Sequence, residues 1–445
     1  MRLGSTSVIA SKFNEIGSCT MRIAIIGAGI TGLTSAFALT ERGHSVTVFD
    51  QHRYAAMATS FANGGQLSVS NAEVWNSTAT VLKGIAWMFK KNAPLSVSLK
   101  PSWRKYEWFA RFLSEIPNYR KNTVKTVELA LEARTELMRM ATEADADFDL
   151  EKRGILHIYR ERKLFDHAAR VNELLKQGGL ERMAVTAAEA RTIEPTLDLD
   201  LYGGFYTPSD LSGDIHKFCR GLAKALVKRG AVLNFETSIS DLRAANGGAT
   251  LACKRTTPGA ISEQANFDAV VICAGVASAH LGAMVGDRIP VYPVKGYSIT
   301  VALENAAAQA AAPRVSLLDD ATKIVASRFG NDRFRVAGTA EINGYNLDVR
   351  ADRIEPLTRW IRDLFPGVPT DRITPWAGLR PMMPNMLPKV GAGKRAGIYY
   401  NTGHGHLGWT LSAATARLLA EKIDEDAAPR RLTRSTGGIR NLVAT

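Results

Sequence analysis

Three glycines near the start of the chain carry the clearest chemical meaning. Gly27, Gly29 and Gly32 follow a short β-branched run at residues 23–26, in the spacing G-x-G-x-x-G. The first glycine allows a tight turn, the second lets backbone approach a pyrophosphate, and the third lets a helix pack on a strand. Asp50 ends the next predicted strand, where a carboxylate can accept both hydrogen bonds of a ribose diol. The pattern predicts a βαβ unit that binds a dinucleotide, FAD or NAD; a structural turn without ligand is the alternative.

The segment that leaves the second strand, residues 51–70, is rich in small and polar residues and keeps no helical period. Its hydroxyl and amide groups lie beside the flexible pair Gly64 and Gly65, which suits close passage along a cofactor. We expect this loop to line the cofactor, with a polar surface loop as the alternative.

Two later segments repeat the order of strand, glycine turn and helix. The apolar run at 267–273 ends in Ala274 and Gly275, where the chain can turn against the cofactor phosphates. The segment IYYNTGHGHLGWT, residues 398–410, precedes a predicted helix at 411–423, whose amino terminus provides a second anion or carbonyl site.

A different pattern precedes that last helix. Residues 290–301 and 323–339 read as antiparallel strands, with a hairpin at Gly330 and Asn331, and such a sheet could cover a cofactor. In the following segment, prolines at 375, 381, 384 and 388 are expected to exclude regular structure. Arg380, held rigidly among them, is positioned like a recognition residue.

Composition limits the partners. The chain has 445 residues and a formal net charge of +13, which favours an anionic partner such as FAD or a membrane surface. No nucleic-acid motif occurs, so no nucleic-acid partner is expected. No apolar run reaches the roughly 18 residues that a membrane span needs, so any membrane association would be peripheral. The four cysteines match no zinc spacing, so no metal site is predicted and a reducing, cytoplasmic location fits.

A basic aromatic segment occupies residues 71–121, where four tryptophans and several other aromatics alternate with lysines and arginines. Aromatic anchors among basic residues suit the headgroup level of an anionic membrane, here the inner face of the cell membrane. A basic helical face whose aromatics pack inward is the alternative.

Several of these stretches together resemble one family. MRIAIIGAGITGLTSAFAL, TSFANGGQ, YPVKGYSIT, GLRPMMP and NTGHGHLGWT are similar to the bacterial D-amino acid dehydrogenases (small subunit type), within the FAD-dependent amine oxidases that include D-amino acid oxidase and glycine oxidase. The resemblance covers residues 21–423 and implies oxidation of a D-amino acid by hydride transfer to flavin N5. The imino acid would then hydrolyse to a 2-oxo acid and ammonia, and the electrons would pass to a quinone or another carrier.

The resemblance also implies roles for particular residues. Arg380 matches the arginine that binds the substrate carboxylate, and a guanidinium can hold a carboxylate bidentately. Tyr297 could add a hydroxyl to the same carboxylate, or pack in the core. His404 lies between glycines, so its backbone is the more important part. The implied cofactor-binding residues are Gly27, Ala28, Gly29, Ile30, Thr31, Gly32, Asp50, Gln51, Ser60, Asn63, Gly65, Gln66, Ala274, Gly275, Gly403, Gly405, Leu407, Gly408 and Thr410.

The predicted fold class is α/β, α+β overall: a Rossmann-type FAD-binding domain interleaved with an antiparallel-sheet substrate domain. The expected boundaries are a flexible extension at 1–20, an FAD-binding domain at 21–70, 200–289 and 370–425, a substrate domain at 71–199 and 290–369, and a tail at 426–445.

One departure from the family pattern affects the substrate. Close family members often carry Pro-Asp-Gly after the arginine loop, whereas this chain has Pro384, Asn385 and Met386. Two other functions therefore stay open. One is oxidation of secondary amino acids of the opine, sarcosine, glycine or hydroxyproline type; the other is a flavin-binding subunit that is inactive without partners.

Overall fold

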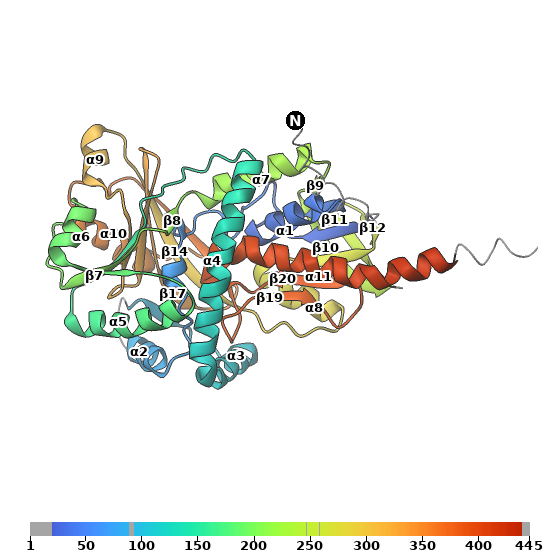
Figure 1. The fold of residues 1–445 in the computed structure, drawn as a ribbon, viewed down its shortest axis with the longest axis horizontal. Coiled ribbons are helices and arrows are strands. Elements are labelled where there is room, and N and C mark those ends of the chain that lie inside the picture. Colours follow the sequence, from blue (N-terminus) through green and yellow to red (C-terminus); the bar gives the residue numbers. More distant parts are fainter. Residues whose placement is uncertain (1–19, 89–92, 246, 258, 438–445) are drawn as a thin grey trace, which may run out of the picture.

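The computed structural model describes residues 20–88, 93–245, 247–257 and 259–437. The predicted extension before residue 20, the end of the predicted tail, and residues 89–92 of the basic aromatic segment lie outside these ranges. The chain forms two lobes, each built around one large sheet (Figure 1).

The first lobe is built on a six-stranded sheet in the order β19-β20-β13-β1-β2-β9. Its strands are β1 (Arg22–Ile26), β2 (Ser45–Phe49), β9 (Val232–Asn234), β13 (Ala269–Ile272), β19 (Lys389–Ala392) and β20 (Ile398–Thr402). All neighbours are parallel except β19, which runs antiparallel to β20. The central strands are continuous apolar runs because both faces of a parallel sheet are covered. The predicted βαβ unit is confirmed. Its predicted continuation through the strand that precedes Ala274 and Gly275, here β13, is confirmed as well.

Helices cover one face of this sheet: α1 (Ile30–Glu41), α7 (Ile215–Lys228) and α11 (Gly408–Gly437), with the long α4 (Tyr119–Glu143) packed across α11 (Figure 1). Their shared core includes Ile25, Phe37, Phe218 and Leu419. α11 continues well past the predicted end at residue 423.

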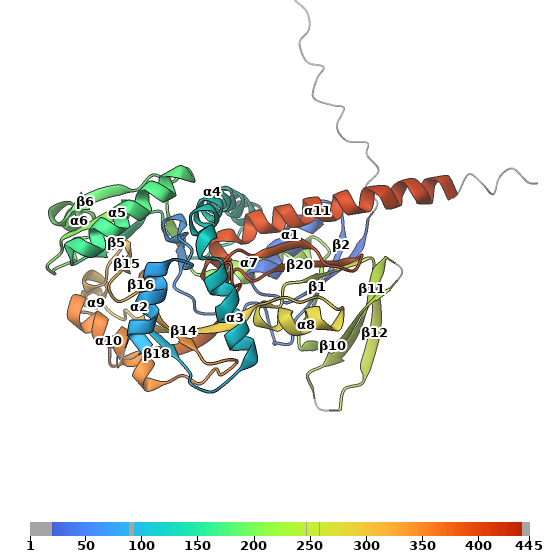
Figure 2. The ribbon, with the colours of Figure 1, turned by 90° about the horizontal axis from the view of Figure 1, so that it is seen from below.

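The other face carries a three-stranded antiparallel sheet, β10 (Thr237–Ala245), β11 (Gly248–Arg255) and β12 (Ser262–Phe267), together with η3 (Gly275–Ala277) and α8 (Ser278–Met284) (Figure 2). The sequence reading had assigned no strands between residues 237 and 266.

The second lobe is a nine-stranded mixed sheet in the order β18-β14-β17-β16-β15-β5-β7-β6, with β4 paired to β17. The strands are β4 (Leu95–Val97), β5 (Ile155–Tyr159), β6 (Met183–Thr186), β7 (Gly203–Thr207), β14 (Tyr292–Ala302), β15 (Ser316–Asp319), β16 (Ile324–Phe329), β17 (Arg333–Ile342) and β18 (Ile373–Met382). The helices α6 (Ala187–Ile193), α9 (Ala306–Ala311) and α10 (Ala351–Leu364) pack against one face. The predicted hairpin between β16 and β17 is confirmed.

β18 corrects the expectation that prolines exclude regular structure here. Pro375 pairs with Ile299 and Pro381 with Pro293, both in the antiparallel ladder to β14. β18 is the edge strand of the described sheet, and an edge strand tolerates residues that lack an N–H. β18 and β7 both belong to the nine-stranded sheet, although their segments were predicted within the FAD-binding domain.

The basic aromatic segment forms α2 (Thr78–Met88), β4, α3 (Trp103–Ser114) and η2 (Ile116–Asn118), on one side of the molecule (Figure 2). Trp108 and Phe112 pack inward, whereas Trp103 is 79% exposed and Leu82 is 62% exposed. Some aromatic side chains of this segment therefore pack inward, as at Trp108 and Phe112, and others are exposed, as at Trp103. Within the described residues, none of the helices has the length and apolar content to cross a bilayer.

Among the remaining elements, β3 (Gln66–Leu67) pairs with β8 (Leu211–Ser212). η1 (Val69–Asn71) and α5 (Arg162–Gln177) contact α4, and η4 (Gly405–Leu407) contacts β18 and α11.

Candidate active site

A cavity of about 1190 Å³ lies between the two large sheets. Its wall includes the turn between β1 and α1, the end of β2, the turn before α11, and the inner face of β14, β17 and β18. The topology thus brings both glycine turns and Arg380 to one space, although the first turn is more than 300 residues from Arg380 and from the second turn.

The first glycine turn is tightly packed except at its middle member. Gly27 has φ +110°, and a Cβ there would lie 2.7 Å from the carbonyl oxygen of Cys273. A Cβ on Gly32 would overlap the Gly27 carbonyl oxygen. A Cβ on Gly29 would meet only Ser60 Oγ, at 3.5 Å. Packing within the protein therefore requires glycine at positions 27 and 32. At position 29 the protein itself leaves room for a side chain, on the cavity side.

The groups beside this turn suit an anionic dinucleotide. Asp50 accepts hydrogen bonds from the backbone N–H of Ala28 at 2.7 Å and of His52 at 2.9 Å, which fixes its carboxylate. Each oxygen keeps a lone pair for another donor, such as a ribose hydroxyl. Ser60 Oγ accepts from Ile30 N at 3.1 Å, and the first turn of α1 has no acidic side chain, so the helix end stays favourable for a phosphate.

The second turn approaches the nine-stranded sheet. Gly403 has φ +78° and Gly405 has φ +59°, and a Cβ at either position would strike the side chain of Met383 or Met382. Thr410, in the first turn of α11, accepts a hydrogen bond from Ser68 N at 3.3 Å. This contact ties the second turn to the loop that follows β2.

The loop after β2 is anchored to the second lobe. Gln66 Nε2 donates to Ser316 Oγ at 3.0 Å and to the Leu317 carbonyl at 2.9 Å. Asn63 Oδ1 accepts from Gly65 N at 3.0 Å. The loop is therefore held along the cavity wall.

Most of the predicted cofactor residues line this cavity. They are Gly27, Gly29, Ile30, Thr31, Asp50, Gln51, Ser60, Asn63, Gln66, Ala274, Gly275, Gly403, Gly405, Leu407, Gly408 and Thr410. Ala28, Gly32 and Gly65 are not part of the wall. Ala28 supplies the N–H that holds Asp50, and a side chain on Gly65 would collide with the Phe329 ring.

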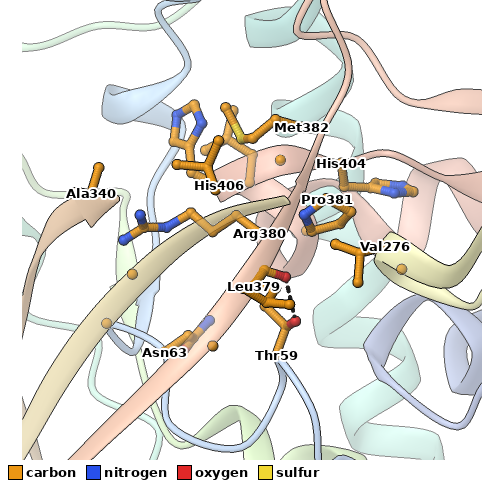
Figure 3. A pocket seen from close by; sticks show the side chains of 18 of the residues that line it. Thr59, Asn63, Val276, Ala340, Leu379, Arg380, Pro381, Met382, His404 and His406 are labelled. Carbon is orange, nitrogen blue, oxygen red and sulfur yellow. Dashed lines mark hydrogen bonds between the residues drawn. The ribbon is translucent and has the colours of Figure 1, made fainter. Parts of the chain in front are cut away.

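Arg380 projects from β18 into the cavity, toward Ala340 of β17 (Figure 3). Its guanidinium lies against the backbone of Gly296 on β14, so that a Cβ at Gly296 would collide with it. Arg380 has no ion pair with any residue that the structure describes. Burial lowers the pKa of Arg380 to about 10, so the group stays charged at neutral pH. A partly desolvated cation without a counter-charge favours binding of an anion, such as a carboxylate.

Tyr297 is among the residues that line the cavity, but its side chain leaves β14 on the face opposite to that of Gly296 and Arg380. Its hydroxyl donates to Glu341, which also pairs with Lys295 Nζ at 3.0 Å. Tyr297 belongs to the core cluster that packs under α10. Burial and the neighbouring Glu341 raise the pKa of Tyr297. The hydroxyl predicted to reach the substrate is engaged on the opposite side of β14.

His404 also points away from Arg380 (Figure 3). Its Nε2 lies 3.0 Å from Thr415 Oγ1, and burial lowers its pKa to about 3. Its backbone forms an isolated bridge with Met382. The backbone of His404, as the sequence reading favoured, is the part that shapes the site.

His406 was missed from the sequence. Its ring stacks on Trp75 with centroids 4.7 Å apart, and Nε2 donates to the Asn71 carbonyl at 3.3 Å. Burial, followed by the charge of Arg380, lowers the pKa of His406 to about 4, so the ring is neutral at pH 7. Only the alternation of His404 and His406 in the glycine turn could have drawn attention to it.

The fold and this cavity define a class: an oxidoreductase with a dinucleotide cofactor. The family model for FAD dependent oxidoreductases matches residues 22–422. The chain belongs to this FAD-dependent family.

Relatives match nearly the whole chain. It is 55% identical over 405 residues to D-amino acid dehydrogenase 3 of Mesorhizobium japonicum, covering 91% of this chain and 97% of that protein. It is 40% identical to D-amino acid dehydrogenase of Paramagnetospirillum magneticum, covering 91% and 95%. The crystal structure of glycine oxidase from Geobacillus kaustophilus superposes with a TM-score of 0.70 at 23% identity, covering 91% and 95%, and supports the fold.

Proposed function

We propose that this chain oxidises D-amino acids to 2-oxo acids and ammonia, with FAD as its cofactor. The observation that carries the proposal is the guanidinium of Arg380, which lies inside the cavity that both glycine turns line and has no ion pair in the part of the chain that the structure describes. The named activity of the relatives supports the same substrate class.

We propose the following division of the cavity. The turn at 27–32 and Asp50 hold the ADP half, the loop with Ser60 and Gln66 runs past the flavin, and the turn at 403–410 contacts the flavin ring. FAD, when bound, accepts a hydride from the substrate Cα. The domain division predicted from the sequence is retained as part of this proposal, with β7 and β18 moved to the substrate domain.

The chain's own residues act on the substrate mainly by orientation. Arg380 binds the carboxylate in a bidentate manner and so fixes which face of Cα is turned to the cofactor. His404 and His406 are neutral at pH 7, so neither ring adds a charge to that of Arg380. Within the described residues no group of ligands could hold a metal ion, and the proposal needs none.

Anaerobic flavin bleaching tests the substrate class. Purified holoprotein is mixed with a panel of D-amino acids, their L-enantiomers and N-substituted amino acids. We expect bleaching at 450 nm with D-amino acids and little with L-enantiomers. Faster bleaching by sarcosine, hydroxyproline or an opine would favour the secondary-amine alternative. Bleaching that occurs only after a partner is added would favour the subunit alternative.

The proposal also covers the electron acceptor. We propose that a quinone or another carrier, rather than oxygen, reoxidises the enzyme. Under air with a D-amino acid, hydrogen peroxide should form at a small fraction of the rate of dye reduction. Peroxide formation that matches substrate consumption would identify an oxidase instead.

A peripheral contact with the membrane would give the enzyme access to a quinone there. The exposed surface of α2 supports such a contact. No residue of α2 is buried, and Leu82, Ile85 and Met88 are exposed. Trp103 of α3 is exposed beside Arg104. Apolar anchors next to basic side chains suit an anionic headgroup surface.

Vesicle co-sedimentation tests this contact. Wild type should sediment with anionic vesicles more than with neutral ones, and the double variant Leu82→Gln with Trp103→Gln should lose most of this binding. Val227→Gln, which replaces an exposed valine of α7, is the matched control and should bind as wild type. Binding that does not depend on lipid charge, or on the double change, would contradict the contact.

A further inference from the structure

β17 contains a bulge at Thr339. Gly296 of β14 pairs with Ala340, and the next residue, Tyr297, pairs with Gly338, so Thr339 is the extra residue. Thr339 has φ +48° and is the one β-branched residue with positive φ in the described ranges. A β-branched residue in this region is an outlier that the surrounding structure must enforce. Bulges of this kind often occur next to active sites, where they redirect a side chain.

The bulge lies beside Arg380. Thr339 lines the cavity and precedes Ala340, toward which the guanidinium points (Figure 3). Ala340 is the register partner of Gly296, and Gly296 supports that guanidinium. Paired residues on adjacent strands lie about 5 Å apart, and consecutive Cα atoms about 3.8 Å apart. A small carboxylate on Arg380 would therefore lie close to the main chain at Thr339.

The hydroxyl of Thr339 has no hydrogen-bond partner among the described residues. The residue is 5% exposed, and its Oγ1 is buried. The neighbouring hydroxyls on β14 differ in this respect, since Ser298 Oγ donates to the Ala62 carbonyl at 2.7 Å and the Tyr297 hydroxyl donates to Glu341. Buried hydroxyls are normally paired, so an unpaired one needs an explanation.

We propose that the Thr339 hydroxyl, whose oxygen is buried in the structure, turns toward the cavity by rotation about χ1 and donates a hydrogen bond to the substrate carboxylate beside Arg380, and that the bulge places the residue there. A carboxylate keeps lone pairs free after two guanidinium hydrogen bonds, so it can accept a third. Thr339 takes the place that the sequence assigned to the Tyr297 hydroxyl. The inference rests on the proposed function and adds a second binding residue to it.

The variants Thr339→Ser and Thr339→Ala form a matched pair, because they differ by one hydroxyl and must both adopt the same positive φ. The holoenzyme is titrated with pyruvate, a 2-oxo acid that carries the carboxylate but no amine, and binding is followed by the flavin absorbance. We expect Thr339→Ala to raise the Kd about tenfold over Thr339→Ser, as for loss of a hydrogen bond to a charged group. Equal Kd values for the two variants would overturn the proposal.

Thr339→Gly guards against misfolding, since glycine adopts φ +48° without strain. It should retain FAD and the wild-type absorbance spectrum while binding pyruvate as weakly as Thr339→Ala. Pyruvate binding by Thr339→Gly at wild-type strength would overturn the role of the hydroxyl. If wild type is not bleached by any D-amino acid, the proposed function fails. If wild type is bleached but Ser and Ala variants bind alike, only the assignment of Thr339 fails.

Discussion

The two lobes contribute to the cavity in different ways. On the six-stranded sheet, the main chain forms most of the site: the glycines at 27 and 29, an N–H that holds Asp50, and the end of α1. On the nine-stranded sheet, side chains form it, above all Arg380 supported by Gly296. A main-chain site is recorded in the sequence as spacing, whereas a side-chain site depends on which face of a strand each residue occupies.

The largest expected effect is in the first lobe. Gly32→Ala places a methyl group on the Gly27 carbonyl oxygen, so we expect a protein that neither folds fully nor retains FAD. Gly29→Ala meets only an ordinary contact and is the matched comparison. It should fold and take up FAD at high concentration, with a Kd for FAD raised about tenfold or more. Flavin absorbance and circular dichroism distinguish the two variants. A Gly32→Ala protein that retains FAD and has wild-type stability would contradict the prediction.

In the second lobe, Arg380→Ala should leave FAD bound and raise the substrate KM about 100-fold or more, since it removes a buried charged hydrogen-bonding group. Arg380→Lys should recover only part of the loss, because an ammonium cannot form the bidentate pair. Steady-state kinetics with a D-amino acid measure both. An unchanged KM in Arg380→Ala would remove this residue from the substrate site.

Gly296→Ala tests the support beneath Arg380. The added methyl group would displace the guanidinium without changing any charge, so KM should rise about tenfold while FAD content stays normal. The pyruvate Kd should rise in parallel. A wild-type KM would show that the guanidinium position is not set by this contact.

Tyr297→Phe should have a smaller and different effect. The hydroxyl is bonded to Glu341, and Lys295 still pairs with that carboxylate in the variant. We expect KM to stay within about twofold of wild type, and the free energy of unfolding to fall by about 1 kcal/mol, measured by urea denaturation. A large rise in KM with unchanged stability would return Tyr297 to the substrate site.

The smallest expected effect is on the pH dependence of the free energy of unfolding. Burial lowers the pKa of His406 to about 4 in the folded protein, whereas the unfolded chain has a value near 6.5. Between these values the unfolded state binds more protons, so the free energy of unfolding falls as pH drops from about 6.5 toward 4. His406→Gln should flatten part of this slope, measured by urea midpoints at pH 5 and 7 with FAD in excess. Identical slopes would indicate that His406 is protonated alike in both states.

The two lobes also differ in how much of each could be predicted from the sequence. Gly27, Asp50 and the strands around them follow from local spacing and apolar runs, and the structure has them at one wall. Arg380 was predicted as a recognition residue from its setting among prolines, and a resemblance gave it the role of binding a carboxylate. That rigid setting was attributed to the prolines rather than to the edge strand that holds it.

The other misses arise from long-range structure. Tyr297 and Gly296 are adjacent, yet they face opposite sides of β14, and no local pattern says which side carries the cavity. The bulge at Thr339 becomes visible only when β17 is paired with β14. His406 meets Trp75 across more than 300 residues.

The packing of α1 against α11 has a consequence for biosynthesis. α1 begins at residue 30 and α11 at residue 408, so this wall of the cavity joins segments that leave the ribosome far apart in time. A ribosome-bound chain lacks that wall until residue 408 and the helix that follows it have been made. We therefore expect a chain truncated before residue 408 to lack this part of the cavity wall.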